Sequence, residues 1–451
     1  MKTLRNKNRY IRLRAPFIIS LVGFSFLLQC SSTPDSAPDK VEPGIKFKIS
    51  CANEQATRHH YSPTTGEIAE RGPVLLTKGM TCNDASKLDE KEMLKLQRDG
   101  EWIGYYAGNA KVLWRGLFKK NKREGDVKYF DQGGKVTKVV AYQDGQQEGR
   151  EEGYFGDGSI RYKGQNSKGM KTGNWEEYSS VKRECTTQGS YNQDEKTGTW
   201  QECSQDEDEK WYISFKGSYK QGLKDGAAES FHPNGTISGK GSYRADLTCK
   251  ENPPSEGVEA CGRRTGKWQI YYPSEKLAME GSYDGMTGKR TGNWTEYYAS
   301  GEKMAMGPRN HTRNGLWTFY NKNGQILGQY GFKGNDFMAS QCVLYENGTK
   351  KEEGGCTNVL VQYKADKDAM QIGNIMRAGQ WTGYYSNGKK AWEGQFMMKL
   401  KVEQWAYYNE AGALTAKGKY NMDKKTGIWQ ETENGRLVTV EYDAFGRPVK
   451  K

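Results

Sequence analysis

The chain has 451 residues, of which 35% are hydrophobic, and its formal net charge is +13. Six basic residues and no acid lie in the first 14 positions, so the rest of the chain carries 62 basic against 55 acidic residues. These charges are interspersed and form no dense basic stripe, which argues against nucleic acid as a partner.

Residues 1–29 are predicted to be a signal peptide. The basic segment precedes an apolar run at 15–29, which falls short of the roughly 20 residues that span a bilayer as a helix. The run ends in Leu-Leu-Gln before Cys30, which looks like a bacterial lipobox and resembles the looser form of spirochaete-type lipoproteins. We therefore expect acylation of Cys30, for instance with palmitate, and a lipid-anchored protein of the bacterial outer membrane that is periplasm-facing or surface-exposed. An uncleaved anchor, or ordinary cleavage with Cys30 incidental, is the alternative.

The segment after Cys30 divides into a tether and a cap region. Residues 30–45 are small, polar and Pro-containing, as expected of a lipidated tether. Residues 46–98 are predicted to form an N-terminal cap region that contains a degenerate repeat. Within this region, residues 84–98 have apolar side chains at helical spacing, which predicts a short helix before the following array.

Eight cysteines remain after Cys30, and they fall into four well-separated couples. An even number in an exported chain predicts a disulfide framework. The predicted pairs are Cys51–Cys82, Cys185–Cys203, Cys249–Cys261 and Cys342–Cys356. Cys203 and Cys342 stand where the repeat described below places an aromatic residue, so a disulfide is expected to replace a core ring there. No Cys-x-x-Cys pair occurs and the chain has only four histidines, so we expect neither a metal site nor a cofactor.

Residues 99–446 are dominated by a repeat of 23–26 residues. Its phrase is Gly-x-Trp-x-x-Tyr, followed by Gly-x-Tyr and a Gly-containing turn, as at 266–283. A fixed period of this length predicts an array in which each unit buries its apolar face only against its neighbours. Asn-Gly turns such as Asn323-Gly324 between aromatic-rich runs indicate β-hairpins. The predicted fold is therefore all-β, an elongated single-layer array of repeated antiparallel β-hairpins, with residues 447–451 as a tail.

The aromatic residues of the repeat are interpreted as packing residues. Trp and Tyr three positions apart lie on opposite faces of a regular strand, unless a bulge rotates one of them. The Gly of Gly-x-Tyr would let the ring of the next unit approach the backbone closely. Because the same positions recur in nearly every unit, we favour packing between units over a platform for carbohydrate or lipid stacking.

The repeated phrase resembles the MORN repeat, particularly its second variety found in bacteria. Residues 379–394 are among the closest stretches, and the resemblance covers roughly residues 99–446. It implies single-layer arrays of β-hairpins used as binding or scaffolding surfaces, with no catalytic residue to carry over. Many such bacterial proteins are labelled antitoxin-like, and many are lipoproteins.

Three departures from the repeat are candidates for function. Residues 247–264 contain two consecutive prolines and the Cys249/Cys261 couple. This stapled loop is the preferred site of partner contact, because pre-ordering lowers the entropy lost on binding. Residues 205–209 form an acidic run that lacks the Gly of an EF-hand loop, and residues 357–377 form a longer insertion. For each of the three segments, a passive surface loop is the default interpretation.

The sequence holds no motif of a known catalytic site. A Gly-x-Ser-x-Gly elbow, a His-Glu-x-x-His motif, a phosphate-binding loop and a dinucleotide fingerprint are all absent, so an enzyme is not expected. The sequence predicts a non-enzymatic, lipid-anchored repeat protein that acts as a binding or scaffolding surface in the bacterial envelope. Its expected partners are the membrane, through the lipid on Cys30, and an unidentified protein or glycan. The alternatives are a surface adhesin for acidic host polysaccharide or matrix, and an antitoxin-like neutralising partner of a toxin.

Overall fold

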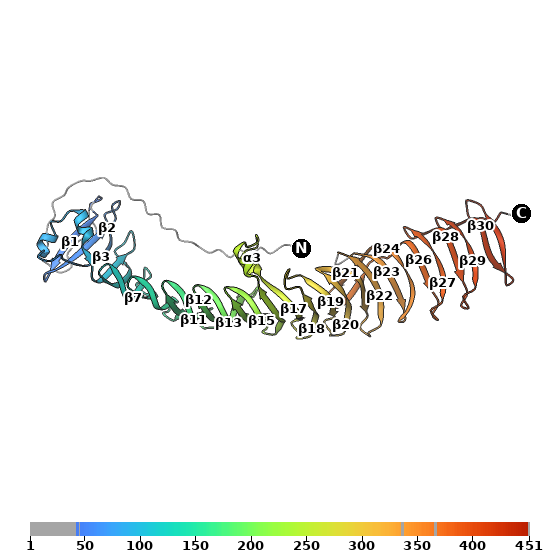
Figure 1. Cartoon of the computed structure of the whole chain (residues 1–451), viewed down its shortest axis with the longest axis horizontal. Coiled ribbons are helices and arrows are strands. Elements are labelled where there is room, and N and C mark those ends of the chain that lie inside the picture. Colours follow the sequence, from blue (N-terminus) through green and yellow to red (C-terminus); the bar gives the residue numbers. More distant parts are fainter. Residues whose placement is uncertain (1–41, 45, 335–337, 365–367, 450–451) are drawn as a thin grey trace. The chain divides into compact units, whose positions relative to one another are not determined.

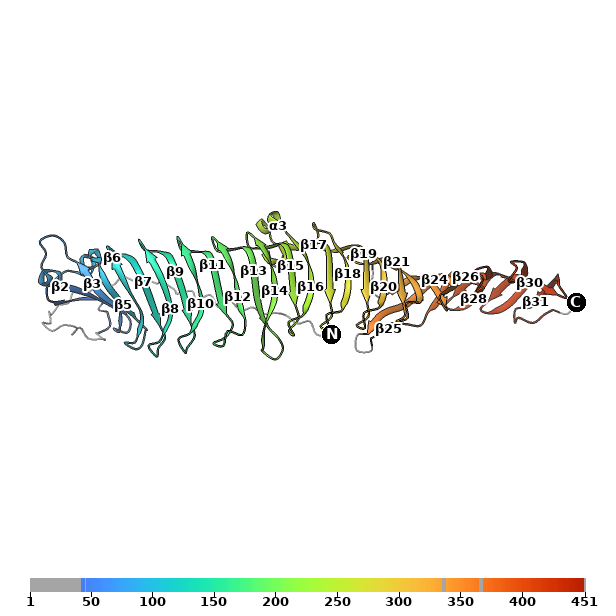
Figure 2. The same ribbon diagram turned by 90° about the horizontal axis from the view of Figure 1, so that it is seen from below.

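The computed structural model describes residues 42–44, 46–334, 338–364 and 368–449 (Figures 1 and 2). The predicted signal peptide, Cys30 and most of the tether lie outside the described residues. Two compact units make up the chain: the first extends to Val136 and includes Tyr142–Gly145, and the second comprises Thr137–Ala141 and the chain from Gln146 onward. Strand β8 (Val136–Gln143) contributes to both units. None of the described helices is long and apolar enough to cross a membrane.

The first unit is an antiparallel sheet with two short helices. Its elements are β1 (Phe47–Ala52), β2 (Gln55–Tyr61), β3 (Ile68–Leu75), α1 (Cys82–Ala85), α2 (Glu90–Lys95), β4 (Gln97–Arg98), β5 (Gly100–Tyr105), β6 (Val112–Lys119) and β7 (Lys122–Phe130). The ladder runs β1, β2, β3, β5, β6, β7, and β4 pairs with the end of β3. Its core gathers the buried side chains of Ile49, Met93, Leu96, Trp102 and Phe118.

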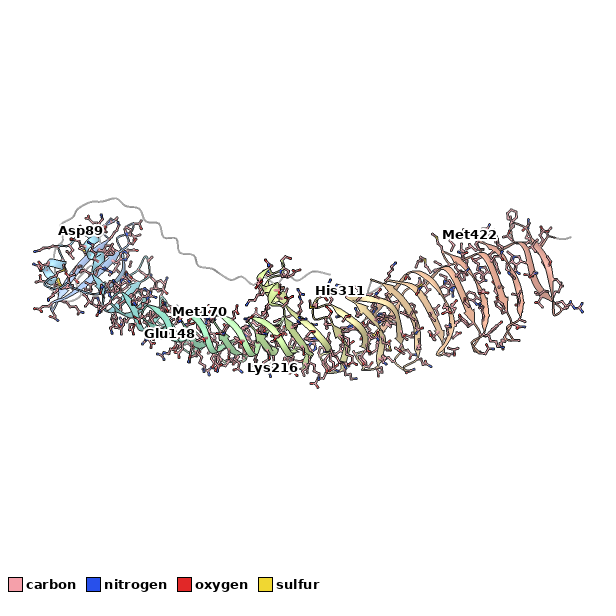
Figure 3. The ribbon with its side chains drawn as sticks, viewed as in Figure 1. Asp89, Glu148, Met170, Lys216, His311 and Met422 are labelled. Carbon is pink, nitrogen blue, oxygen red and sulfur yellow. A yellow bond between two sulfur atoms is a disulfide. The ribbon has the colours of Figure 1, made fainter. Side chains whose placement is uncertain are left out.

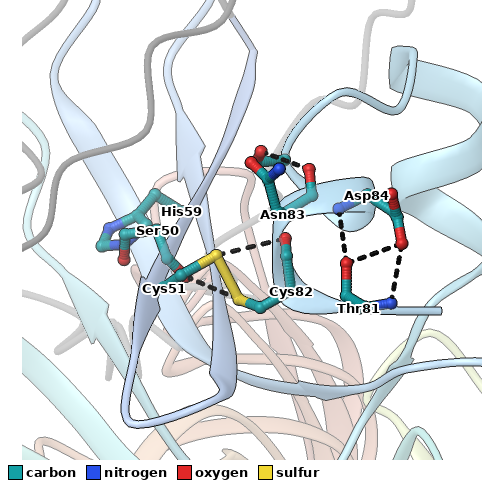
Figure 4. The surroundings of a disulfide bond; sticks show 8 residues. Ser50, Cys51, His59, Thr81, Cys82, Asn83 and Asp84 are labelled. Atoms are coloured by element: carbon teal, nitrogen blue, oxygen red, sulfur yellow. Dashed lines mark hydrogen bonds between the residues drawn. A yellow bond between two sulfur atoms is a disulfide. The ribbon is translucent and has the colours of Figure 1, made fainter.

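The single helix predicted over residues 84–98 is instead two shorter helices. Each begins at a capping box: the Thr81 hydroxyl accepts from the Asp84 N–H at 3.2 Å, and the Asp89 carboxylate accepts from the Glu92 N–H at 2.8 Å. The disulfide between Cys51 and Cys82 ties α1 to β1 (Figure 4). Helix α2 ends at Lys95 because the next residues turn extended and pair with β3.

The second unit is a layer of antiparallel strands in chain order. Its elements are β9 (Gln146–Tyr154), β10 (Ile160–Ser167), β11 (Met170–Tyr178), β12 (Thr186–Asn192), β13 (Glu195–Gln205), β14 (Trp211–Lys220), β15 (Leu223–Phe231), β16 (Ile237–Ala245), α3 (Leu247–Glu251), η1 (Val258–Cys261), β17 (Gly262–Tyr271), β18 (Leu277–Tyr283), β19 (Arg290–Tyr297), β20 (Lys303–Asn310), β21 (Thr312–Tyr320), β22 (Ile326–Lys333), β23 (Met338–Glu346), β24 (Thr349–Lys364), β25 (Ala369–Ile372), β26 (Met376–Tyr384), β27 (Lys390–Met397), β28 (Leu400–Tyr408), β29 (Leu414–Asn421), β30 (Lys424–Glu433) and β31 (Arg436–Tyr442). From β9 to β31 each strand pairs with the next, except that β24 pairs with both β25 and β26. This arrangement confirms the predicted all-β hairpin array.

A β-bulge recurs at the Gly of Gly-x-Trp. In the β18–β19 pair, Glu280 faces Thr295 and Ser282 faces Thr291, so three residues lie opposite the single Gly281. The first of the three, Gly292, has φ of +67°, a conformation that only glycine adopts without steric cost. In β28 the equivalent position is Glu403, whose φ is +58°.

The two faces of the layer carry different aromatic rows. Trp294 is paired across the strands with Gly307 and defines what we term the tryptophan face. Tyr297, three residues on, extends to the opposite face, where its hydroxyl donates to the Glu280 carboxylate at 2.9 Å. The pairing register between β19 and β20 shifts between Glu296 and Tyr297. Both faces of the layer therefore carry an aromatic side chain, and a bulge lies between the two.

In several units a second tyrosine links one hairpin to the next. The Tyr272 hydroxyl donates to the Tyr297 carbonyl at 2.8 Å, and the Tyr298 hydroxyl donates to the Tyr320 carbonyl at 2.7 Å. The Tyr385 hydroxyl makes the same bond to the Tyr408 carbonyl at 2.7 Å. These bonds join backbone to side chain at one-hairpin intervals and fix the spacing between units.

The structure contains four disulfides, and they are the pairs that the sequence predicted. Cys342 is 1% exposed, lies in the main core cluster and faces Tyr330 across the strands. It therefore takes the place of a core ring on the tryptophan face. Cys203 is half-buried at the position that carries Tyr in other units.

Candidate functional site

The tryptophan face is closed by contacts between neighbouring strands. Trp294 lies so close to Gly281 that a Cβ on this glycine would sit 2.2 Å from the indole ring. Its Nε1–H donates to the carbonyls of Ser282 and Thr291, each at 3.2 Å. The same contact, at 2.1 to 2.5 Å, is made by Gly164 with Trp175, Gly189 with Trp200, Gly241 with Trp268, Gly307 with Trp317, Gly354 with Trp381, Gly394 with Trp405 and Gly418 with Trp429. These tryptophans are at most 6% exposed, which supports their interpretation as packing residues.

A basic residue four positions before each tryptophan covers the indole ring. The Arg264 guanidinium lies 4.5 Å from the ring centroid of Trp268 and 5.5 Å from that of Tyr283. Lys196 lies 4.5 Å from the ring of Trp200 and is also ion-paired with Glu202. Since these cations are held against rings within the fold, they contribute little to any surface that attracts polyanions.

Two clusters of buried charge lie in the same region. Glu296 accepts from Arg309 and from Arg313 at 2.7 Å each, and all three side chains are at most 7% exposed. Glu352 accepts from the Nε–H of Arg377 at 3.1 Å. Buried charges persist only when they are paired, so we assign these groups to the architecture of the fold.

The insertion at 357–377 contains a two-stranded ribbon, whereas the default expectation from the sequence was a passive surface loop. Strand β24 continues beyond its partners in the layer and pairs with β25 through Val361 to Lys364. Val361 is fully buried in the main core cluster, and Met370 and Ile372 pack against that cluster. The ribbon therefore covers part of the tryptophan face, and Tyr363 contacts Tyr298 with ring centroids 6.1 Å apart.

Asp368 fastens this ribbon to two earlier turns. Its carboxylate accepts from the Ala299 N–H at 2.9 Å, from the Ser300 hydroxyl at 3.0 Å and from Lys322 Nζ at 2.5 Å. The Tyr363 hydroxyl donates to it as well, at 2.9 Å. The hydrogen bond from Lys322 is the largest cause that lowers the pKa of Asp368 to about 2.

The stapled loop is anchored at its base and exposed at its tip. The Asp246 carboxylate caps α3 through the Cys249 N–H at 3.0 Å and pairs with Arg263 at 3.3 Å. Lys250 donates to the Gln221 carbonyl at 2.6 Å and pairs with Glu195. Residues 251–256 at the tip are exposed, and Leu247, beside the base, and Val258 are 37% and 38% exposed. Helix α3 stands out from the strand layer in both ribbon views (Figures 1 and 2), so the loop presents a pre-ordered surface.

The acidic run and two of the four histidines lie at turns. In the acidic run at 205–209, the Asp206 carboxylate accepts from the Asp208 N–H at 3.0 Å and the Lys210 N–H at 2.8 Å, as in an Asx-turn. His232 Nε2 lies 2.9 Å from the Tyr271 carbonyl oxygen beside a turn. His311 is itself a turn residue with φ of +68°.

The opposite face contains a feature that the sequence analysis missed, a hollow of about 560 Å³ over β13 to β17. We call it the lysine hollow. It is lined by Thr199, Lys216, Gly217, Ser218, Ala227, Ala228, Glu229, Lys240, Gly241, Ser242, Lys267 and Gln269. Figure 3 labels Lys216, whose side chain points away from the strand layer. The hollow forms because small residues occupy its centre, and the Ala227-Ala228 pair in place of x-Trp was the sequence signal for it.

Comparison with known proteins finds the repeat in three places. Residues 224–245, 264–284 and 313–333 match the MORN repeat variant. No curated protein matches the chain. A solved structure titled "Crystal Structure of TcdB2-TccC3-Cdc42" is similar over 87% of this chain and 26% of that chain, with 10% identity and a TM-score of 0.13. This chain thus spans about a quarter of that one, and a likeness so weak carries no argument. The first two matched segments flank the stapled loop.

Proposed function

We propose that this protein is a non-enzymatic binding or scaffolding surface of the bacterial envelope, anchored by a lipid on Cys30. The observation that carries the proposal is the use of the repeat's aromatic residues. Because the tryptophans pack unit against unit, the residues left for partners are those of the stapled loop and of the opposite face. The matches to the MORN repeat variant agree with a repeat-based binding or scaffold role.

The compartment is part of the proposal. Four disulfides form and persist in an oxidising environment, such as the periplasm or the cell surface. The basic and apolar leader before Cys30 adds an export signal and an acylation site. We expect palmitate labelling that is lost in the Cys30→Ala variant, and protease treatment of intact cells would separate a surface-exposed from a periplasm-facing protein.

The stapled loop is the proposed site of protein contact. Its disulfide and its two anchors, at Asp246 and Lys250, hold it in one conformation, so little entropy is lost when a partner binds. The exposed apolar side chains of Leu247 and Val258 supply contact area on the loop.

The test is affinity capture from envelope extracts, with bound proteins identified by mass spectrometry. The full chain is compared with a variant in which residues 247–261 are replaced by an Asn-Gly turn, and with a Leu247→Ser/Val258→Ser variant that keeps the staple. We expect at least one partner to be lost from both variants. A partner list that is the same for all three proteins would reject the loop as the contact site.

A further inference from the structure

The lysine hollow contains two lysines whose cross-strand neighbour is a carboxylate that neither of them pairs with. Lys216, Glu229 and Lys240 form a cross-strand row in which the carboxylate lies directly between the two lysines. Side chains opposite each other in this way have Cβ atoms about 5 Å apart. Yet, among the described residues, neither ammonium has a carboxylate within ion-pair distance. Lys216 and Lys240 are exposed, and their ammonium groups lie 5.5 Å from the Phe231 ring centroid and 5.8 Å from the Tyr271 ring centroid. The half-buried Lys196 and Arg264 of the tryptophan face are closer to their rings, at 4.5 Å.

The same two repeat positions are paired elsewhere in the array. At β10 and β11 they hold Lys163 and Glu176, which face each other across the strands and form an ion pair at 3.1 Å. The geometry of the strands therefore permits the pair. In the lysine hollow two lysines flank one glutamate, so the row keeps a net charge of +1, and no group among the described residues forms an ion pair with either lysine.

The hollow is also lined by hydroxyl groups that are available for hydrogen bonding. Within the described residues, the hydroxyls of Thr199, Ser218 and Ser242 form no hydrogen bond with another protein group. Their counterpart just outside the hollow, Ser190, donates to the Asn174 side chain at 2.7 Å. Three hydroxyls without a partner in the described part of the protein, on the same face as two ammonium groups that form no ion pair there, make a site for a ligand that is itself rich in hydroxyls and carries sparse negative charge.

We propose that the lysine hollow binds a linear acidic polysaccharide with about one carboxylate per disaccharide. This inference rests on the proposed function as a binding surface and assigns a partner class to it. Lys216 on β14 and Lys240 on β16 are two strands apart, which places their backbone positions about 9.5 Å from each other. That spacing suits acids carried on alternate sugars. Duplex DNA, with one charge per about 1.7 Å, would leave most of its phosphates without a cation here.

The lining is unsuited to a lipid surface. None of the exposed large apolar side chains of the described residues belongs to it, whereas insertion into a bilayer interface needs such side chains. The hollow is open and crosses five strands, so an extended chain can enter from either end. The bound acids would replace water at Lys216 and Lys240, and sugar hydroxyls would bond to Thr199, Ser218 and Ser242.

The experiment is calorimetric titration of the full chain with hyaluronan oligosaccharides at about 50 mM salt. We expect measurable binding that weakens about tenfold in Lys216→Gln/Lys240→Gln, since two charge-assisted hydrogen bonds are lost. The matched control Lys163→Gln removes the same residue type from the same repeat position outside the hollow and should bind as the wild type does. Binding should also weaken at 0.5 M salt, where the charges are screened.

Several outcomes would overturn the inference. They are the absence of hyaluronan binding, equal affinity in the double variant, equal loss in Lys163→Gln, or binding of duplex DNA or anionic vesicles as tight as that of hyaluronan. Neutral dextran that binds equally well would also reject it. If envelope partners are still captured through the stapled loop while hyaluronan fails to bind, only this inference falls. If both assays fail, the proposed binding function falls with it.

Discussion

The contact between Gly281 and Trp294 makes the clearest prediction about what holds the array together. We consider the variant Gly281→Ala. The new Cβ would lie 2.2 Å from the indole ring, and real contacts of this kind are not shorter than 3.0 Å. The ring has little room to retreat, because it is 1% exposed and its Nε1–H bonds to two carbonyls.

The magnitude follows from three terms. Overpacking a dense core costs about 1–3 kcal/mol, and the loss of one net hydrogen bond adds about 1 kcal/mol. Replacing a strand glycine by alanine returns about 0.5–1 kcal/mol of backbone entropy. We therefore expect about 1–3.5 kcal/mol of local destabilisation. Because repeat arrays unfold locally, the assay is native-state hydrogen exchange of the β18 and β19 amides.

Two further variants make this prediction refutable. Gly156→Ala adds a Cβ that meets no atom within 4 Å, so protection there should change by less than about 0.5 kcal/mol. In Gly281→Ala/Trp294→Leu the smaller side chain leaves room for the new methyl, so the double variant should lose at least about 1 kcal/mol less than the sum of the single ones. A loss below about 0.5 kcal/mol for Gly281→Ala, or strict additivity, would show that the ring is not wedged against the glycine.

Three more predictions test other elements. Glu403→Gly should stabilise the β27–β28 region by about 0.5–1 kcal/mol in hydrogen exchange, because it relieves a φ of +58° and loses only an exposed ion pair with Lys419. The reverse change at the matched position, Gly427→Glu, should destabilise β30 by about 1–2 kcal/mol. The pKa of the Asp368 carboxyl is lowered from 3.8 to about 2. The carboxylate therefore stabilises the ribbon fully at pH values above about 3.8, and this stabilisation is lost as the pH falls through about 2. Pepsin cleavage within 357–375 should accordingly rise between pH 4 and pH 2 in the wild type, whereas Asp368→Asn should be cleaved readily at both. Cys249→Ser/Cys261→Ser should make the bond after Lys250 at least tenfold more sensitive to trypsin, while the strand signal in circular dichroism stays unchanged. Unaltered cleavage would mean that this disulfide does not order the loop.

The sequence predicted the parts of this fold that follow from local repetition. The period, the hairpin turns and the close approach of a ring to a glycine each recur, so Gly281 and Trp294 could be matched without coordinates. The disulfides were predictable because each couple lies within 31 residues or fewer, and neighbouring hairpins bring such residues together.

What the sequence could not predict depends on contacts between distant segments. The ribbon of β24 and β25 returns to turns near Ser300, 68 residues earlier, and a repeat period holds no information about that. The helix over 84–98 was predicted as one element because apolar spacing cannot show that residues 97–98 form a strand that pairs with β3. The lysine hollow required register as well as sequence, since only the cross-strand order reveals that Glu229 is shared by two lysines.

The hydroxyl bonds of Tyr272, Tyr298 and Tyr385 bear on how such a chain can evolve. Each bond reaches only to the backbone of the following hairpin. A duplicated or deleted repeat would thus find the same acceptor at the same distance, and the gene can gain or lose whole units by unequal recombination without any change at the junction. Length becomes a trait that selection can adjust in steps of one hairpin, and variants that differ by 23–26 residues should remain folded.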